Sequence, residues 1–217
     1  MDRLENATVA VFGLGGVGGA VAEALARSGI GRLFLYDADV VKPSNLNRQI
    51  IATHKTVGMP KVEAMAERLN SINPEMDLAL HQVRITPESE IPWEEFDFAL
   101  DCIDTVTSKL FLIENAHKNG VEIASSMGMG NRMHPECVTI TDISKTHHCS
   151  LARVMRRELR LRGIQHLTVA FSTEEALPIV VDTEHARHAP ASSPFVPPVA
   201  GYMLAAYAVR RLVGEDA

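Results

Sequence analysis

The stretch GLGGVG at residues 13–18 matches the pattern GxGxxG and decides the fold. A short β-branched run precedes it, and a helical pattern of small residues follows it as far as Ser28. Glycines in such a stretch permit a tight turn and a close backbone approach, and the helix that begins there offers free N–H groups to a phosphate. In this context the stretch predicts a nucleotide site, with a purely structural glycine turn as the alternative.

A second expected strand, at 33–36, ends on Asp37 and closes a unit of the size typical of β-α-β. The same alternation continues along the chain, with a helix at 62–72, a strand at 78–83, a strand at 96–103, a helix at 109–118 and a strand at 121–126. Such alternation predicts an α/β fold, in which a Rossmann-like, mostly parallel sheet has helices on both faces.

The remaining sequence is less regular and predicts a smaller, mixed-strand C-terminal part. Strands are expected at 137–143 and 166–171, and helices at 151–162 and 199–209. We expect a single domain over 1–217, with a nucleotide-binding half at 1–130 and a substrate and dimer half at 131–217. The low periodicity of 173–193 predicts a mobile loop.

Composition narrows the classes of partner and compartment. The 21 Lys and Arg residues against 27 Asp and Glu residues give a net charge of −6, so no global positive field indicates a polyanion partner. The three cysteines form no CxxC pair, which favours the reducing cytoplasm. The N-terminus lacks the positive region of a signal peptide, and the apolar run at 199–209 is shorter than the roughly 20 residues that span a bilayer. We therefore expect a cytoplasmic protein without a membrane partner.

Three charged residues argue against the simplest nucleotide enzyme, an NAD dehydrogenase with Asp37 on the ribose hydroxyls. Arg48, Lys61 and Asp104 are expected near the crevice at the C-terminal ends of the strands, where ligands bind. A pyrophosphate already faces the helix dipole, whereas a triphosphate carries more charge to neutralise. Two cations and a carboxylate that can hold magnesium favour phosphoryl or adenylyl transfer.

Four motifs in order resemble the adenylating superfamily of ThiF, MoeB, HesA and the ubiquitin-activating enzymes: GLGGVGG, DADVVKPSNLNRQ, VGMPKVEAMAERLNSINP and DCIDT. The resemblance implies that ATP and Mg²⁺ are cofactors. The residues that it assigns to the ATP crevice are Gly13, Gly15, Gly16, Gly18, Asp37, Asp39, Asn45, Arg48, Gln49 and Lys61.

Within that crevice the resemblance implies distinct roles. Asp37 would bind the ribose, and Asn45, Arg48 and Lys61 would contact the phosphates. Asp104 would hold magnesium, and Arg48, Lys61 and Asp104 are the expected catalytic residues. The alternative for each side chain is a surface ion pair or a loop cap.

Cysteine usage separates the branches of this superfamily. Members similar to MoeB and ThiF typically carry two CxxC pairs for a structural zinc, and this sequence has none, so we expect no zinc. Three adjacent ligands such as His147, His148 and Cys149 cannot easily converge on a metal. Cys149 is an acceptor-thiol candidate for sulfur or a ubiquitin-like tail, with an incidental cysteine as the simpler interpretation. A sulfur-transfer partner and a monovalent cation are left open.

The second half, including SSMGMGNRMHPECVTITDISK and SSPFVPPVAGYMLAAYAVRRLVG, is similar to the branch of tRNA threonylcarbamoyladenosine dehydratases. The resemblance implies a homodimer that adenylates the threonylcarbamoyl carboxylate of a modified adenosine in tRNA, after which the side chain cyclises with loss of water. An acyl-adenylate is a good electrophile, and the ring-closing nitrogen is already tethered nearby. The alternatives are adenylation of the C-terminus of a ubiquitin-like sulfur carrier and a nucleotide-binding scaffold without activity.

A cluster of arginines at 153–162 supplies a candidate tRNA surface on this acidic protein. Four of them share one helix face, a pattern that suits the phosphate backbone. The expected tRNA contacts are Arg153, Arg156, Arg157 and Arg160, extended by Arg132 and Lys145. A solvated helix surface or a salt-bridged dimer seam is the alternative.

The N-terminus departs from the pattern of this branch, whose members usually begin further upstream with a helical arm. An arginine of that arm reaches the ATP of the partner subunit. The opening MDRLEN resembles only the end of the arm. We therefore expect low activity from this chain and a gain in turnover when the upstream codons are restored.

Overall fold

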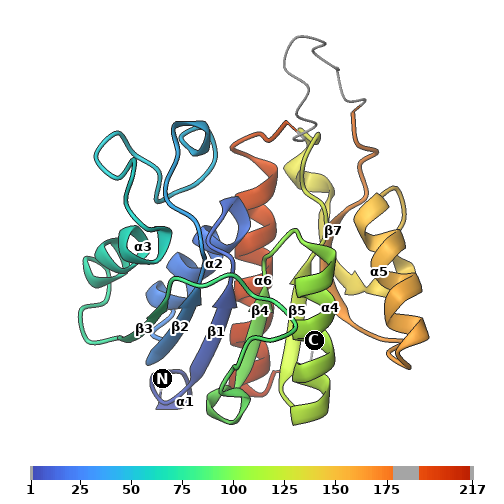
Figure 1. Ribbon diagram of the computed structural model, residues 1–217, viewed down its shortest axis with the longest axis horizontal. Coiled ribbons are helices and arrows are strands. Elements are labelled where there is room, and N and C mark those ends of the chain that lie inside the picture. Colours follow the sequence, from blue (N-terminus) through green and yellow to red (C-terminus); the bar gives the residue numbers. More distant parts are fainter. Residues whose placement is uncertain (1, 178–190, 216–217) are drawn as a thin grey trace.

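Seven strands form one sheet in the computed structural model, which describes residues 2–177 and 191–215 (Figure 1). The strands are β1 (Thr8–Phe12), β2 (Arg32–Tyr36), β3 (Asp77–His81), β4 (Phe98–Asp101), β5 (Glu122–Ser126), β6 (Val138–Asp142) and β7 (Thr168–Ser172). Their order is β3-β2-β1-β4-β5-β7-β6, and every neighbouring pair is parallel except β6 with β7. The antiparallel edge strand confirms the predicted mixed-strand continuation.

Helices cover both faces of the sheet, as the alternating pattern predicts. They are α1 (Asp2–Glu5), α2 (Gly16–Arg27), α3 (Lys61–Asn70), α4 (Val106–Asn119), α5 (Ser150–Leu161) and α6 (Val196–Val213). Helices α2, α3 and α6 share one apolar core with the sheet, while α4 and α5 share the other (Figure 1). The predicted α/β class is therefore confirmed.

The central strand shows why the sheet lies between two layers. Val9 and Val11 of β1 point into the core beneath α2 and α6, whereas Ala10 and Phe12 point into the core beneath α4, and all four are fully buried. A strand that is apolar on both faces is stable only between two covering layers. The short run before the glycine stretch thus fixes the position of β1 in the centre of the fold.

Element boundaries differ from the sequence-based expectations by a few residues. The strand expected at 96–103 is confined to Phe98–Asp101, and the helix expected at 109–118 begins at Val106. Of the expected loop at 173–193, residues 173–177 and 191–193 are in neither helix nor strand. The rest of that stretch lies outside the described residues.

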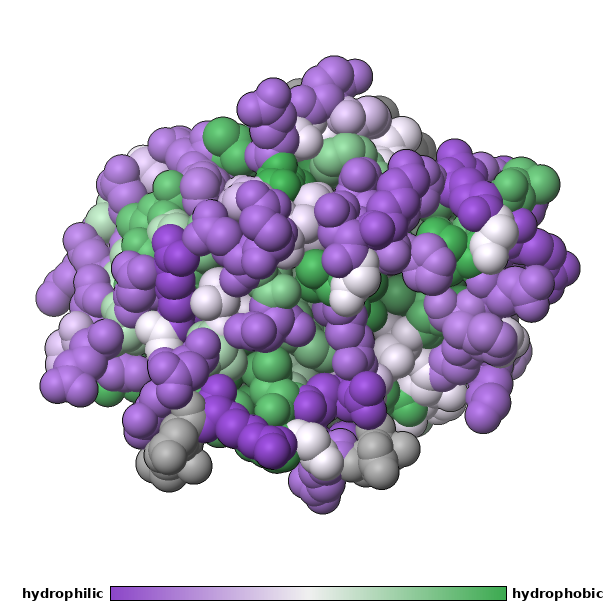
Figure 2. Space-filling view, turned by 90° about the horizontal axis from the view of Figure 1, so that it is seen from below, coloured by the Kyte–Doolittle hydropathy of each residue, from purple (hydrophilic) through white to green (hydrophobic). Residues whose placement is uncertain are grey.

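The face at the amino-terminal ends of the parallel strands is mainly hydrophilic. Figure 2 views this face and shows apolar side chains in several separate areas between polar ones. Within the described ranges, no helix has both the length and the apolar character needed to cross a bilayer.

Candidate active site

The glycine stretch forms the turn between β1 and α2 at the carboxyl end of the central strand. Gly13 has a φ of +90°, and its N–H donates to the carbonyl oxygen of Tyr36 over 2.7 Å. A Cβ on Gly18 would lie 1.7 Å from the carbonyl oxygen of Gly13, closer than any side chain permits. The backbone therefore folds back on itself at this point and requires glycine at both positions.

Helix α2 starts inside this turn and points its N-terminus at the carboxyl edge of the sheet. Its N-cap residue is Gly15, and no described side chain caps the first turn. Uncapped N–H groups and the positive end of the helix dipole together form an anion site. The turn therefore has the geometry of an anion site, and the phosphate that the sequence pattern predicts there stays a prediction.

The carboxylate of Asp37, directly after β2, is tied to the glycine turn. One of its oxygens accepts from the N–H of Leu14 at 2.7 Å, and the other accepts from the N–H of Asp39 at 2.9 Å. The side chain is only 9% exposed. Asp37 therefore shapes the turn itself, in addition to the ribose contact that remains a prediction.

Lys61, the first residue of α3, places its ammonium group between two carboxylates. Its Nζ lies 3.0 Å from Asp39 Oδ2 and 3.4 Å from Asp37 Oδ2. Burial raises the pKa of Asp39, but the hydrogen bond and charge of Lys61, together with the charges of Lys42 and Arg84, outweigh burial and lower it. The structure thus brings Lys61, Asp37 and Asp39 together, with the cation poised beside the crevice.

The segment after Pro43 supplies the opposite wall. Asn45 is buried, and its Oδ1 accepts from the N–H of Lys42. Gln49 is also buried, with no hydrogen-bond partner for its Oε1 among the described residues. Its Nε2 lies 3.9 Å from the point where a Cβ on Gly15 would stand. An unpartnered buried amide oxygen beside the glycine turn is an open position for a ligand donor.

Arg48 lines a cavity of about 260 Å³ next to this wall, together with Gln49, Gly16 and Pro198. Its guanidinium group is held by the carbonyl oxygen of Ser44 and by Asn47 Oδ1, both at 2.9 Å. The described chain pairs it with no carboxylate. Its charge is therefore available to an anion that enters the cavity.

Asp104 follows β4 at the same edge of the sheet and is exposed. Among the described residues, its carboxylate forms one hydrogen bond, with the hydroxyl of Thr105 at 3.4 Å. Strand β4 pairs with β1, and a Cβ on Gly13 would lie 3.0 Å from the carbonyl oxygen of Cys102. The turn that carries Asp104 is therefore packed directly against the glycine turn.

Two charged residues beside this turn have no role in the sequence-based assignment. Asp101 and Lys109 are fully buried, and Lys109 Nζ lies 2.8 Å from Asp101 Oδ2. The sequence does contain a sign of this burial. Lys109 shares the helical spacing of Leu112, Ile113 and Ala116, which are all buried. A lysine at a core position indicates a specific buried partner.

The arginine helix presents only part of its predicted stripe as free charge. Arg153 and Arg160 are exposed, and their side chains form no hydrogen bond or ion pair with the described residues. Arg157 pairs with Glu158 at 2.8 Å, and Arg156 donates to the backbone carbonyl of Thr146. Lys145 is exposed nearby. The accessible part of the stripe therefore centres on Arg153 and Arg160.

Arg132 is buried in the fold and does not lie on the surface. It is 4% exposed, and its guanidinium group donates to the carbonyl oxygens of Gly128, Gly130, His148 and Glu174 over 2.6–3.2 Å. These bonds hold three chain segments together. Arg132 is therefore not part of the free basic surface that the sequence indicated.

The three cysteines are free thiols. Cys149 is buried at the N-cap of α5, where its sulfur accepts from the N–H of Ala152 at 3.4 Å. No group of three His, Cys, Asp or Glu side chains in the described part of the chain is placed to hold a metal ion. The structure thus gives Cys149 a capping contact.

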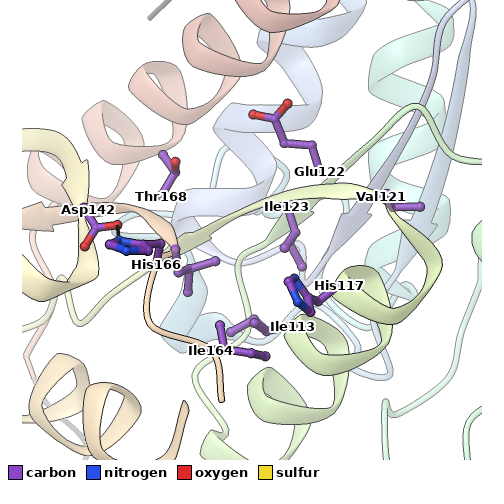
Figure 3. A pocket seen from close by; sticks show the side chains of 10 residues that line it. Ile113, His117, Val121, Glu122, Ile123, Asp142, Ile164, His166 and Thr168 are labelled. Carbon is purple, nitrogen blue, oxygen red and sulfur yellow. Dashed lines mark hydrogen bonds and ion pairs between the residues drawn. The ribbon is translucent and has the colours of Figure 1, made fainter. Parts of the chain in front are cut away.

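A second cavity, of about 250 Å³, lies at the amino-terminal edge of the sheet (Figure 3). Ile113, His117 and Ile164 are among its lining residues, and His166 Nδ1 lies 3.2 Å from Asp142 Oδ2. Because it adjoins the starts of β5 and β7, it is at the opposite edge from the glycine turn. It is separate from the crevice.

The doubly covered parallel sheet, the glycine turn and the charged groups at its carboxyl edge define a nucleotide-binding α/β protein of the Rossmann-like class. The chain belongs to the ThiF family, whose sequence profile matches residues 1–217.

Comparison with individual proteins gives a narrower set of relatives. The chain is 39% identical over 232 residues to the tRNA threonylcarbamoyladenosine dehydratase of Bacillus subtilis, covering 99% of this chain and 90% of that protein. The crystal structure of the Escherichia coli tRNA N6-threonylcarbamoyladenosine dehydratase in complex with AMP has a TM-score of 0.90 at 30% identity, covering 99% of this chain and 89% of that one. A more distant relative is the adenylyltransferase and sulfurtransferase UBA4 of Vanderwaltozyma polyspora, 34% identical over 130 residues, which are 59% of this chain and 30% of that protein.

Proposed function

We propose that the protein is an ATP-dependent tRNA threonylcarbamoyladenosine dehydratase that acts in the cytoplasm. The observation that supports this proposal most strongly is the similarity to the Bacillus subtilis dehydratase over 99% of this chain. This similarity includes the half of the chain beyond the nucleotide crevice. The similarity to the sulfurtransferase relative covers 59% of this chain. The proposal assigns ATP to the half at 1–130 and tRNA to the half at 131–217.

In the proposed reaction a carboxylate oxygen of the threonylcarbamoyl group attacks the α-phosphorus of ATP, and pyrophosphate leaves. A nitrogen of the carbamoyl group then attacks the activated carbonyl carbon and loses its proton. The bond to AMP breaks, and AMP departs with the carboxylate oxygen. The nucleoside has lost the elements of one water molecule, and the tethered nucleophile makes ring closure effectively unimolecular.

The charged groups of the crevice would stabilise the transferred phosphates. The first turn of α2 would bind a phosphate, and Arg48 and Lys61 would neutralise further charge as pyrophosphate departs. Asp37 and Asp39 keep the ammonium of Lys61 at the crevice wall. The open Gln49 Oε1 would accept a hydrogen bond from a hydroxyl or amino group of the nucleotide, since the phosphate oxygens carry no donor.

Asp104 is the residue we propose to hold Mg²⁺. Magnesium commonly binds through one or two carboxylates and completes its shell with water and substrate phosphates. An exposed carboxylate beside the glycine turn fits this requirement, although the described residues contain no cluster of three ligands. When bound, the ion would reduce the negative charge of the triphosphate.

Mass spectrometry of tRNA nucleosides tests the proposal directly. Incubation of threonylcarbamoyladenosine-containing tRNA with the protein, ATP and Mg²⁺ should convert the nucleoside to one lighter by one water. Omission of ATP should leave it unchanged. An unchanged nucleoside in the complete reaction, with ATP consumption stimulated instead by a ubiquitin-like carrier protein, would favour the sulfur-carrier alternative.

Arg153 and Arg160 should carry much of the tRNA affinity. Replacing both by alanine removes two unpaired surface charges, so binding should weaken and the dependence of log K on log salt should lose about two units. Filter binding of tRNA at several salt concentrations measures both quantities. Arg210→Ala removes one positive charge from α6 on the other face of the sheet and should change neither; an equal effect there would reject a localised tRNA surface.

We also propose that α6 contributes a homodimer seam next to the crevice. Phe195, Tyr202 and Val213 are 52%, 45% and 39% exposed, and their spacing places them on one side of the helix. Pro194, just before α6, and Pro198, in its first turn, line the cavity of about 260 Å³ that Arg48 also lines. An apolar helix face of this kind indicates a protein partner.

The dimer seam is tested by placing a charge on it. Tyr202→Glu should shift the sedimentation coefficient from dimer to monomer, because an unpaired carboxylate would be buried in the interface. Leu161→Glu is the matched control, since Leu161 is 76% exposed on α5 across the sheet. A Tyr202→Glu variant that sediments like the parent chain would contradict this seam.

A further inference from the structure

The buried pair of Asp101 and Lys109 is the strongest electrostatic feature that the proposed reaction does not use. Both side chains are fully excluded from solvent, at the end of β4 and in the first turns of α4. Lys109 Nζ donates to Ile103 O at 2.9 Å and to Ser126 O at 2.8 Å, besides its contact with Asp101. All three of its protons therefore have acceptors.

The carboxylate of Asp101 is equally well satisfied. Its Oδ2 accepts from the hydroxyl of Ser125 at 2.7 Å, and its Oδ1 accepts from the N–H of Ile103 at 3.2 Å. Apolar residues of similar volume commonly replace a buried ion pair without loss of stability, because removing two charges from water is costly. A gain in stability is therefore a weak reason for this pair, and its place beside the Asp104 turn points to a second role.

The pair holds the residue before Asp104, and the first backbone hydrogen bond of α4 holds the residue after it. The side chain of Lys109 binds the carbonyl oxygen of Ile103, and its backbone N–H binds the carbonyl oxygen of Thr105 at 3.0 Å. The peptide N–H of Cys102 is bound to Phe12 O, so the turn is also anchored to β1. Asp104 therefore lies in a turn that the Lys109 side chain holds on one side and the backbone of α4 holds on the other.

We propose that Lys109 is a positioning residue, which with Asp101 holds the Asp104 carboxylate at the orientation needed for Mg²⁺ and ATP. The inference rests on the proposed function only through the role of Asp104 towards the nucleotide, and it does not depend on tRNA as the substrate. Preorganised charge avoids reorganisation when the ligand binds, so a loosened turn weakens binding even when Asp104 itself is intact.

The test is a double-mutant cycle on nucleotide binding. Removing Lys109 alone would leave Asp101 as a buried unpaired charge, so the variant combines Lys109→Met with Asp101→Asn. Calorimetric titration with ATP and Mg²⁺, without tRNA, should show a loss of affinity of about tenfold in this variant, the size of a typical site-to-site coupling. The same variant in an Asp104→Asn background should show almost no further loss, since the lysine acts through that carboxylate.

Two further variants separate positioning from general destabilisation. Leu159→Ala opens a cavity in the core beneath α5 and should lower the melting temperature while leaving nucleotide affinity unchanged. Ser125→Ala removes one hydrogen bond to Asp101 and should give a smaller loss of affinity, again absent in the Asp104→Asn background. This variant decides the question if the double replacement does not fold.

The combined variant would overturn the proposal if its loss of ATP affinity equalled the product of the losses in the pair variant and in Asp104→Asn. Such a result would mean that the pair and Asp104 act independently. Unchanged affinity in Asp104→Asn would overturn it as well. Coupled losses in nucleotide affinity together with no conversion of tRNA would support the positioning role and reject the proposed substrate. The two proposals therefore fail in different measurements.

Discussion

Replacing Gly18 by alanine is expected to lower the free energy of unfolding by about 3 kcal/mol and to abolish ATP binding. The added Cβ would lie 1.7 Å from the carbonyl oxygen of Gly13 and 3.2 Å from the Cβ of Cys102. The first of these atoms belongs to the backbone of the same tight turn, so no side-chain rotation relieves the clash. The turn has to open, and the N-terminus of α2 moves away from the phosphate position.

Urea unfolding and calorimetric titration with ATP measure the two effects. Gly15→Ala is a matched control for stability, because the nearest atom to its added Cβ is Gln49 Nε2, at 3.9 Å. Gly15 is extended, with φ −74° and ψ −154°, so its φ is negative and lies in the range open to alanine. Equal stability of the Gly18→Ala variant and the parent chain would show that the turn does not have the required close contact.

Asp104→Asn should reduce ATP-dependent turnover by a factor of about 10²–10³, the range seen when one preorganised electrostatic contact to a transition state is removed. The substitution keeps the shape of the side chain and removes its charge. Stability should change little, because the carboxylate is exposed and its one hydrogen bond within residues 2–177 and 191–215 is the 3.4 Å bond from Thr105.

AMP release is measured in a single turnover of the modified tRNA, with the protein in excess over the tRNA and ATP in excess over both. This measurement gives the rate. Raising the Mg²⁺ concentration should restore part of it, because a weakened metal site fills at higher concentration. Glu67→Gln removes an exposed carboxylate from α3 and should leave both rate and magnesium dependence unchanged. Normal turnover in Asp104→Asn would instead reject this carboxylate as the magnesium ligand and revive the scaffold interpretation.

Much of the fold follows from local sequence patterns. The alternation of apolar strands and amphipathic helices predicts the class, and the glycine stretch correctly predicts the turn between β1 and α2. Boundaries are less accurate at the carboxyl edge of the sheet. Strand β4 ends at Asp101 because the next residues turn to meet the glycine turn and Lys109, contacts that no local pattern contains.

The burial of charged residues also depends on contacts that no local sequence pattern contains. A lysine or arginine in a sequence normally indicates a solvated position. Lys109 is nevertheless buried against Asp101, and Arg132 is buried by carbonyl oxygens from residues as distant as His148 and Glu174. These acceptors come together only in the folded chain, so the sequence placed Arg132 on the surface and assigned Lys109 no role.

The contact between α2 and α6 links the glycine turn to the order of protein synthesis. A Cβ on Gly201 of α6 would lie 2.3 Å from the carbonyl oxygen of Val17, so the two helices touch at backbone distance in the first turn of α2. Residues 16–27 leave the ribosome long before residues 196–213 do, and until then this turn has no partner on that side. The nascent chain therefore packs this side of α2 only after most of the sequence described here has been translated.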